Sequence, residues 1–279
     1  MPGTDSPSDP AGNRTGEQPD AGAHRLRVLA DEPAAPRLRV LVDEPGDAAW
    51  NMAVDAALLE LAEEPTLRIY GWQPHAVSLG YFQKIADFAD LPAGTSIVRR
   101  TTGGGAIHHG DELTFSLALS ASLLPGDIAE SYVLLHDAIV RALATIGVTC
   151  HRAQSGKVAA ARPSSRWCFE TPVRDDLITD TGKLLGSAQR RTNTNQHRVL
   201  HHGSLVINRP QFTPFVAAVC DQVPITGLVR RELHSEIITE LTKVLGLHAH
   251  PGERTAAEDA MAARLCEEQF RNPAYLHRR

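Results

Sequence analysis

Alternation of apolar and polar residues begins near position 37 and predicts a strand followed by a helix. Leu38, Val40 and Val42 alternate with other residues, which is the period of a half-buried strand. A Pro-Gly pair ends that pattern, and Asp47 directly after it is a residue type that caps helix N-termini. We therefore expect a strand here and a helix from Asp47 to Leu61.

Helical periodicity returns in three later stretches. In the first, Leu135, Ile139 and Ala142 share one face and Gly147 follows as a C-cap. The segment 150–174 is polar and aperiodic, which predicts a long loop. The predicted helices lie at 130–147, 230–247 and 254–270, and further predicted strands lie at 67–72, 76–82, 96–100, 112–119, 176–190 and 198–207. This mixture predicts an α+β fold with a mixed, largely antiparallel sheet and flanking helices, which we place on one side of it.

The first 36 residues differ in composition from the rest of the chain. They are rich in Pro and Gly and carry almost no aliphatic residue before Leu26. Such a segment buries too little surface to offset the entropy of ordering, so we predict a disordered tail at 1–36 and a single domain at 37–279. The motif RLRVLADEP at 25–33 recurs as RLRVLVDEP at 37–45. The first copy is either a spare strand or part of the tail.

Composition and charge exclude several classes of protein. The net charge is −5 and the pI is about 6.2, which argues against a general nucleic-acid binder. No apolar run is long enough to span a bilayer, and the N-terminal residues have no apolar signal-peptide core, so we expect a cytoplasmic protein without a membrane partner. The four cysteines are widely spaced, which fits neither a disulfide framework nor a zinc site.

A glycine-rich stretch, RRTTGGGAIHHG at 99–110, follows one of the predicted strands. Consecutive glycines let the backbone approach a ligand closely, and Arg99 and Arg100 could bind a carboxylate or phosphate. The spacing matches neither the dinucleotide nor the Walker fingerprint, and a plain hairpin turn is the alternative. His108 and His109 would point to opposite faces of a strand, so we do not expect them to share a metal.

Three other segments carry candidate chemistry. Lys183 opens a strand containing the small residues Gly186 and Ser187, which mark either ligand contact or a surface hairpin. Cys168, between aromatic residues, is either a small buried hydrophobe or a nucleophile that needs a cation nearby, such as Arg166, Lys183 or a histidine. The segment LHHGSLVI at 200–207 has a histidine pair before a strand, and a half-buried strand histidine is its simplest interpretation.

Taken together, these segments resemble one family: the lipoate–protein ligases, biotin protein ligases and octanoyltransferases. The resemblance rests on motifs in the family's order. They are NMAVD at 51–55, GWQPHAVSLGYFQ at 71–83, RRTTGGGAIHHGDELTFS at 99–116, KLLGSAQ at 183–189 and HHGSLVI at 201–207. The resemblance implies the catalytic-domain fold of those ligases.

The element CFETP at 168–172, fifteen residues before Lys183, resembles the Cys-type octanoyltransferases. That resemblance implies an octanoyl or lipoyl group transferred from acyl carrier protein to a lysine of a lipoyl domain or of glycine cleavage protein H, through an acyl-Cys168 intermediate. It implies no required cofactor. Two alternatives stay open within the family, an ATP- and magnesium-dependent lipoate ligase and an octanoyl amidotransferase, and beside them a non-catalytic binding module.

The resemblance also assigns expected roles to residues. Cys168 and Lys183 would be catalytic, with Lys183 and the backbone N–H groups of 103–106 stabilising the oxyanion, and His202 would accept a proton or position the ligand. Tyr70, Val77, Leu79 and Phe82 would line an acyl tunnel. The expected substrate-binding residues are Arg99, Arg100, Gly103, Gly104, Gly105, Ala106, His109, Gly186, Ser187, Ala188, His202 and Gly203, and no metal ligand is expected.

Overall fold

The computed structural model describes residues 36–154, 166–192 and 197–279. The predicted tail, apart from Pro36, and the first copy of the repeat lie outside the described residues. The second copy forms the first described strand, β1 (Arg37–Val42), and the Pro36 carbonyl accepts a hydrogen bond from His248 N at 2.9 Å.

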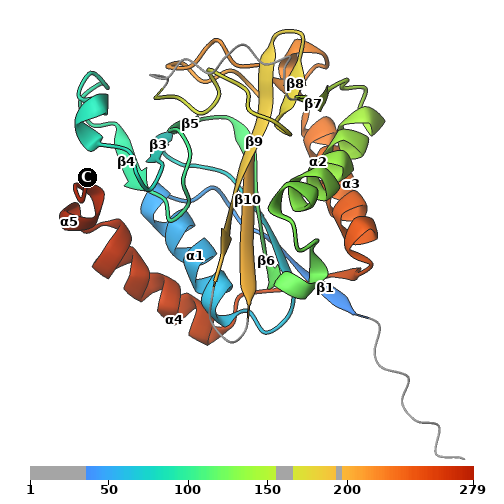
Figure 1. Ribbon diagram of the computed structural model, residues 1–279, viewed down its shortest axis with the longest axis horizontal. Helices are drawn as coiled ribbons and strands as arrows, with labels where there is room; N and C mark the ends of the chain where they lie inside the picture. Colours follow the sequence, from blue (N-terminus) through green and yellow to red (C-terminus); the bar gives the residue numbers. More distant parts are fainter. Residues whose placement is uncertain (1–35, 155–165, 193–196) are drawn as a thin grey trace, which may run out of the picture. The chain divides into compact units, whose positions relative to one another are not determined.

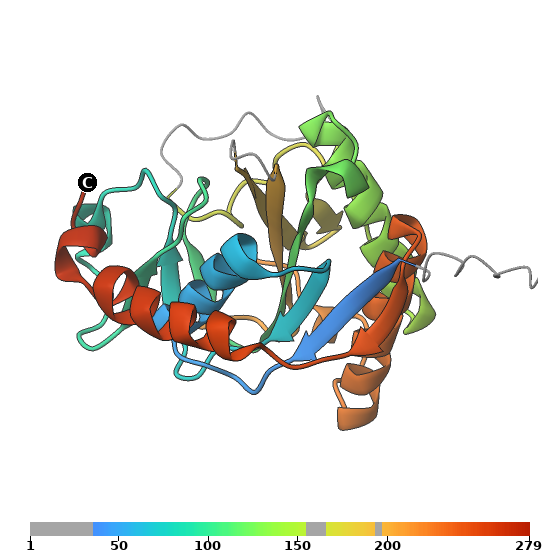
Figure 2. The same ribbon diagram turned by 90° about the horizontal axis from the view of Figure 1, so that it is seen from below.

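The main sheet has eight strands within the described residues (Figures 1 and 2). β1 runs parallel to both of its neighbours, and every other pairing in this sheet is antiparallel. The prediction of a mixed, largely antiparallel sheet is therefore confirmed. The strand order is β11 (His248–Pro251), β1, β2 (Thr66–Tyr70), β6 (Glu112–Ser120), β10 (Arg198–Val206), β9 (Gly182–Arg191), β8 (Leu177–Thr179) and β7 (His151–Arg152).

Helices cover both faces of this sheet, so the prediction that they lie on one side is wrong (Figure 1). The cause is the alternation within β6. Leu117 belongs to the core beneath α2 and α3, whereas Ala118 belongs to the core beneath α1 and α4. Both faces of the strand are apolar, so both must be covered. The helices are α1 (Ala48–Leu61), α2 (Ile128–Thr145), α3 (Gly227–Leu245), α4 (Ala256–Leu265) with a π-helical extension (Cys266–Phe270), and α5 (Pro273–Leu276).

The predicted start of α1 is confirmed by its cap. The Asp47 carboxylate accepts a hydrogen bond from Trp50 N at 2.9 Å, which satisfies one of the free N–H groups at the helix start. The face of α1 toward the sheet is rich in alanine, and these small side chains let the helix pack closely on β6 and β10.

A second, three-stranded sheet carries the glycine-rich stretch. β3 (Ala76–Leu79) pairs parallel with β4 (Ser96–Arg99) and antiparallel with β5 (Ile107–His109). The strand predicted at 76–82 ends at Leu79, because the next two carbonyls accept hydrogen bonds from the Arg99 guanidinium instead of from a strand. We call residues 100–106, between β4 and β5, the glycine loop. Short 3-10 turns lie at Ile85–Phe88, Ala121–Leu123 and Val219–Asp221.

Candidate active site

A cavity of about 450 Å³ opens between the glycine loop, the segment around Cys168 and the strands β9 and β10. Most of the residues expected from the sequence meet there. The expected site residues that line it are Arg100, Gly103, Gly104, Gly105, His109, Cys168, Lys183, Gly186, Ser187, Ala188, His202 and Gly203.

Cys168 and Lys183 are in direct contact at this cavity. The Nζ of Lys183 lies 3.4 Å from Sγ of Cys168, and the same ammonium donates to the carbonyl of Cys168 at 3.2 Å. Asp176 Oδ2 lies 2.7 Å from Nζ on another side. An ammonium group has three protons, and these three acceptors account for all of them. Lys183 is therefore fixed with one N–H directed at the sulfur.

The lysine is buried but remains a cation. Its side chain is 2% exposed, and Asp176 is buried beside it. Burial alone would lower the pKa of Lys183, but its interactions with Cys168 and with the Asp176 carboxylate outweigh it and raise that pKa above its ordinary value. The solvated surface hairpin that we kept as the alternative for Lys183 is wrong.

The other cysteines lie in different surroundings. Burial raises the pKa of Cys150 to about 11 and also raises that of Cys266, whereas Cys220 is exposed. Cys168 is partly exposed and faces the cavity beside a cation, as a nucleophilic thiol requires. The charge beside it comes from Lys183 and not from Arg166, whose guanidinium is paired with Asp90 at 2.6 Å.

Two glycines make this contact sterically feasible. A Cβ on Gly186 would lie 2.5 Å from Cε and 2.7 Å from Nζ of Lys183. A Cβ on Gly105 would lie 2.8 Å from the backbone N of Cys168. The absence of side chains at these positions lets the lysine cross its own strand and lets the cysteine segment lie against the glycine loop.

Arg100 holds the glycine loop in shape. Its Nη2 donates to the carbonyls of Gly103 at 2.7 Å and Gly105 at 2.8 Å, and its Nη1 donates to Ser78 O at 3.0 Å. The loop is joined to the cysteine segment through Ala106, whose N–H donates to Arg166 O and whose carbonyl accepts from Cys168 N, both at 2.8 Å.

Two expected substrate-binding residues do not line the cavity. The N–H of Ala106 is already bonded to the cysteine segment, so it cannot also serve an oxyanion. Arg99 is fully buried and donates to the carbonyls of Gly80, Tyr81 and Gln83 and, from its other side, to the carbonyl of Leu276. Arg99 therefore ties the turn after β3 to the C-terminal helix α5, and both assignments as substrate-binding residues are corrected.

Of the four residues expected to line an acyl tunnel, one lines the cavity. Tyr70 lines the cavity, but Val77 and Leu79 do not, because alternation along β3 turns Ser78 toward the cavity and its two neighbours into a separate core. Phe82 is 67% exposed and lies outside the cavity.

His202 lies at the cavity wall between the glycine loop and α1. Its Nε2 lies 2.8 Å from Thr102 Oγ1, and its Nδ1 lies 3.7 Å from Oδ2 of Asp55. Asp55 is buried and accepts hydrogen bonds from Tyr70 OH at 2.9 Å and Ser116 Oγ at 2.8 Å. Burial opposes ionisation of Asp55, but its contacts with His202, Arg68 and Ser116 hold its pKa below the ordinary value. His202 thus faces a carboxylate whose ionised form the structure favours.

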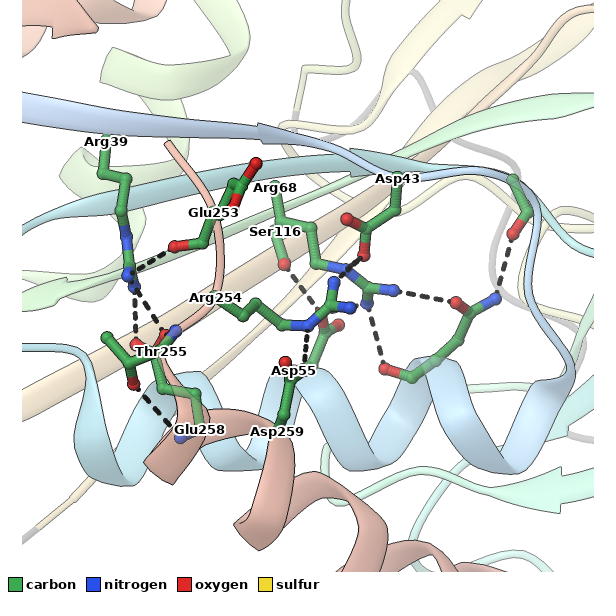
Figure 3. Close-up of polar contacts among 12 residues, drawn as sticks. Arg39, Asp43, Asp55, Arg68, Ser116, Glu253, Arg254, Thr255, Glu258 and Asp259 are labelled. Atoms are coloured by element: carbon green, nitrogen blue, oxygen red, sulfur yellow. Dashed lines mark hydrogen bonds and ion pairs between the residues drawn. The ribbon is translucent and has the colours of Figure 1, made fainter. Parts of the chain in front are cut away.

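Asp55 belongs to a network of ion pairs behind the cavity (Figure 3). Arg68, buried on β2, lies 2.9 Å from Asp55 and 2.7 Å from Asp43. Asp43 is also paired with Arg254 at 2.7 Å, next to the N-terminus of α4. The network fixes α1 and α4 on the strands that form the cavity floor.

His109 is held at the opposite wall. Its ring stacks on Trp72 at 3.6 Å between centroids, and its nitrogens contact Ser78 Oγ and Glu112 Oε1, both at 2.7 Å. His108 turns the other way and stacks on Phe212. In the part of the chain that the structure describes, no group of three or more His, Cys, Asp or Glu residues could hold a metal ion.

The motifs did not indicate Asp176, whose carboxylate makes the shortest of the three contacts of Lys183 Nζ. Two adjacent acidic residues precede β8, and nothing in the sequence distinguishes them. Asp175 turns away and pairs with Arg152 at 2.8 Å, whereas Asp176 points at Lys183. Other lining residues were not expected as site residues. Met52, Trp72, Thr114 and Thr171 lie within the motifs without an assigned role, and Tyr132, Trp167 and Val173 lie outside them.

The fold and this cavity define a family. Residues 47–249 match the model of the lipoyl protein ligase A/B catalytic domain, and the chain belongs to that family. The resemblance inferred from the five motifs is confirmed.

Several curated relatives are named octanoyltransferase LipM. That of Kyrpidia tusciae is 34% identical over 253 residues, covering 79% of this chain and 91% of the relative. Those of Geobacillus kaustophilus and Bacillus subtilis are 35% and 33% identical over 174 residues, each alignment covering 57% of this chain and 62% of the relative. The chain thus spans nearly all of the first and about three fifths of the other two. The names of these relatives agree with the transferase expectation and do not favour the ligase alternative.

Solved structures show the same fold. Lipoate-protein ligase A bound with ATP has a TM-score of 0.68 and 21% identity, covering 87% of this chain and 98% of that chain. The bipartite lipoate protein ligase of Thermoplasma acidophilum has a TM-score of 0.67 and 20% identity, covering 87% and 96%. The predicted α+β ligase-like fold is confirmed. Within the described residues, no helix has both the length and the apolar character needed to cross a membrane.

Proposed function

We propose that this protein is an octanoyltransferase that moves an octanoyl group from acyl carrier protein to a lysine of a lipoyl domain or of glycine cleavage protein H. The observation that carries the proposal is the contact between Cys168 Sγ and the buried Lys183 ammonium at the cavity. The names of the relatives support the same reaction.

The first step is acylation of Cys168. Cys168 attacks the carbonyl carbon of the donor thioester as a thiolate, with the Lys183 ammonium beside the sulfur. A carbon–sulfur bond to Cys168 forms, the bond to the carrier thiol breaks, and the thiol proton of Cys168 ends on the departing carrier. Once the sulfur has bonded to the carbonyl carbon it is no longer an anion, so the Lys183 N–H that pointed at it turns to the adjacent oxyanion and stabilises it together with the Gly103–Gly105 backbone.

The second step is attack on the acyl-enzyme by the lysine ε-amine of the acceptor. The amine attacks in its neutral form, an amide bond forms, and Cys168 leaves as a thiolate. The surplus proton of the amine goes to His202, whose Nδ1 faces the Asp55 carboxylate that stabilises the imidazolium. The reaction exchanges a thioester for an amide without any change of oxidation state.

The cavity suits an acyl chain. Its volume of about 450 Å³ lies within the range of small-molecule sites. Its walls include the apolar or aromatic side chains of Met52, Tyr70, Trp72, Ile107 and Tyr132. A thioester donor is already activated, so the reaction needs neither ATP nor a metal. Under the ligase alternative, ATP and magnesium would have to form an acyl adenylate first. The cytoplasmic location stays a prediction.

Mass spectrometry of the acyl-enzyme tests the proposal. Octanoyl acyl carrier protein, without ATP or acceptor, should add one octanoyl group that hydroxylamine removes. Cys168→Ala should abolish the adduct, whereas Cys150→Ala, Cys220→Ala and Cys266→Ala should keep it. Lys183→Ala should slow acylation about 10²–10³-fold. Transfer that strictly requires ATP would favour the ligase alternative. If octanoyl protein H were the only donor, the amidotransferase alternative would be favoured. Binding of the donor without transfer would indicate a non-catalytic binding module.

A further inference from the structure

An exposed surface beside the glycine loop combines aromatic rings with cations. We define it as the turn 81–84 together with the C-terminal residues 275–279. The Cζ of Arg278 lies 4.3 Å from the centre of the Tyr81 ring, and that of Arg279 lies 5.6 Å from the centre of the Phe82 ring. Phe82 is 67% exposed, and both arginines are exposed. Figures 1 and 2 show α5 next to β4 and the chain that follows β3.

This surface is joined to the cavity through the backbone. Tyr81 N donates to Thr102 O at 2.9 Å, and a Cβ on Gly103 would lie 3.9 Å from the Phe82 ring. Gly103 itself lines the cavity. Arg99 fixes the arrangement, because its guanidinium binds carbonyls of the turn and the carbonyl of Leu276 at the same time. The two exposed arginines are thus held next to the loop that borders the cavity.

The surface is cationic although the protein as a whole is acidic. The whole chain has a net charge of −5, yet the segments YFQK and YLHRR contain Lys84, Arg278 and Arg279 and no acidic residue. Many other arginines of the protein are neutralised, as Arg68, Arg166 and Arg254 are by aspartates. Among the described residues, no Asp or Glu carboxylate lies within ion-pair distance of Arg278 or Arg279. Exposed charges of this kind attract anionic partners.

We propose that this surface docks the acyl donor, by binding the acidic surface and the phosphate-bearing arm of the carrier protein that delivers the thioester. The inference rests on the proposed function and adds a partner site to it. The donor is favoured over the acceptor because its arm carries a fixed phosphate anion, held outside the cavity at the end of the arm opposite the thioester. A guanidinium held on an aromatic ring keeps its donors directed outward for such a group.

The test compares two donors that differ only in the carrier. Octanoyl acyl carrier protein has the protein and the phosphate, whereas octanoyl-pantetheine has neither, and both can acylate Cys168. The variant Arg278→Glu/Arg279→Glu should lower kcat/KM for acylation by octanoyl acyl carrier protein at least about tenfold. It should change kcat/KM for acylation by octanoyl-pantetheine by less than about twofold. Acylation of the unmodified protein by the carrier should also slow steeply with added salt, and that dependence should flatten in the variant.

A matched control lies on the opposite side of the sheet. Arg231→Glu/Lys243→Glu on α3 makes the same change in net charge at exposed positions and should leave both donors unaffected. Equal losses with both donors, an equal loss in the control, or a loss confined to transfer onto the lipoyl domain would each overturn the docking proposal.

A binding measurement separates this proposal from the proposed function. The affinity of the Cys168→Ser protein for octanoyl acyl carrier protein should fall at least about tenfold when both arginines are reversed. If octanoyl acyl carrier protein never acylates Cys168, the proposed function fails, and this binding result still decides the docking site. Unchanged affinity would reject the docking site even if acyl transfer proceeds normally.

Discussion

Lys183 occupies the space that a side chain at Gly186 would need. A Cβ at that position would lie 2.5 Å from Cε of the lysine, which is closer than real Cβ contacts come. The lysine reaches Cys168 by crossing its own strand above this glycine, so the contact depends on a residue that takes no part in the chemistry.

Gly186→Ala should therefore resemble loss of the lysine. The added methyl group displaces Nζ from Cys168, and acylation should fall about a hundredfold, the cost of a misplacement of roughly 1 Å at a reacting group. Single-turnover acylation followed by mass spectrometry measures the change. Gly126→Ala is the control, because no atom lies within 4 Å of a Cβ built there. Normal acylation by Gly186→Ala would show that Lys183 can act from another position.

Asp176→Asn should slow acylation about tenfold or more. The neutral amide no longer holds the ammonium by charge, so Lys183 loses the partner that fixes it 2.7 Å away. The neighbouring variant Asp175→Asn is a matched control, since Asp175 pairs with Arg152 and its φ of 71° is one that asparagine tolerates. Equal rates in the two variants would argue against a positioning role for Asp176.

Asp55→Asn should lower the free energy of unfolding by about 3 kcal/mol at pH 7, because it leaves the buried Arg68 guanidinium without one of its carboxylates. The pKa of Asp55 is lower in the folded protein than in the unfolded chain. The stabilisation by this carboxylate is therefore complete above about pH 5 and is lost as the pH falls below about 4.

Urea denaturation of both proteins across this pH range measures the effect. The difference in free energy of unfolding between the native protein and Asp55→Asn should be constant from about pH 8 to 5 and shrink below about pH 4. A difference that grows on acidification would mean that Asp55 is protonated in the folded protein.

Arg99→Ala should destabilise the protein by about 3 kcal/mol, because several carbonyls lose a charged donor together. Arg99→Lys should recover part of this loss, since an ammonium can serve some of the same carbonyls. Thermal denaturation of the native protein, Arg99→Lys and Arg99→Ala should give melting temperatures that fall in that order. An unchanged melting temperature combined with a raised KM for the donor would restore the substrate-binding role predicted from the motif.

Removal of residues 1–35 should shift the melting temperature by less than about 3 °C, roughly the effect of 1 kcal/mol in a domain of this size. The composition of the segment is the reason, and Pro36 is retained because its carbonyl bonds to β11. A larger loss would show that the first copy of the repeat adds to the sheet.

The sequence predicts the elements of this protein better than their packing. Strand alternation and the Asp47 cap locate β1 and α1 because those signals are local. The placement of α1 on the second face of the sheet depends on which side of β6 Ala118 occupies, and the neighbouring alanines and leucines in the sequence do not settle it.

The motifs likewise indicate some residues of the candidate site but not others. The motifs identify Cys168 and Lys183, and the fold brings them together across fifteen positions. They do not identify Asp176, because only the backbone turn before β8 distinguishes it from Asp175. They assign Arg99 to the substrate because paired arginines beside glycines suggest an anion site, yet the carbonyls that Arg99 binds come from segments far away in the sequence, as at Leu276.

The bond from Arg99 to Leu276 has a practical consequence for handling this protein. An affinity tag fused behind Arg279 would extend from the end of α5, which Arg99 joins to the turn beside the glycine loop. Such a tag would crowd Arg278 and Arg279, which lie on the rings of Tyr81 and Phe82. Purification through a tag at the other end of the chain avoids that interference, and activities measured with the two tag positions should not be treated as interchangeable.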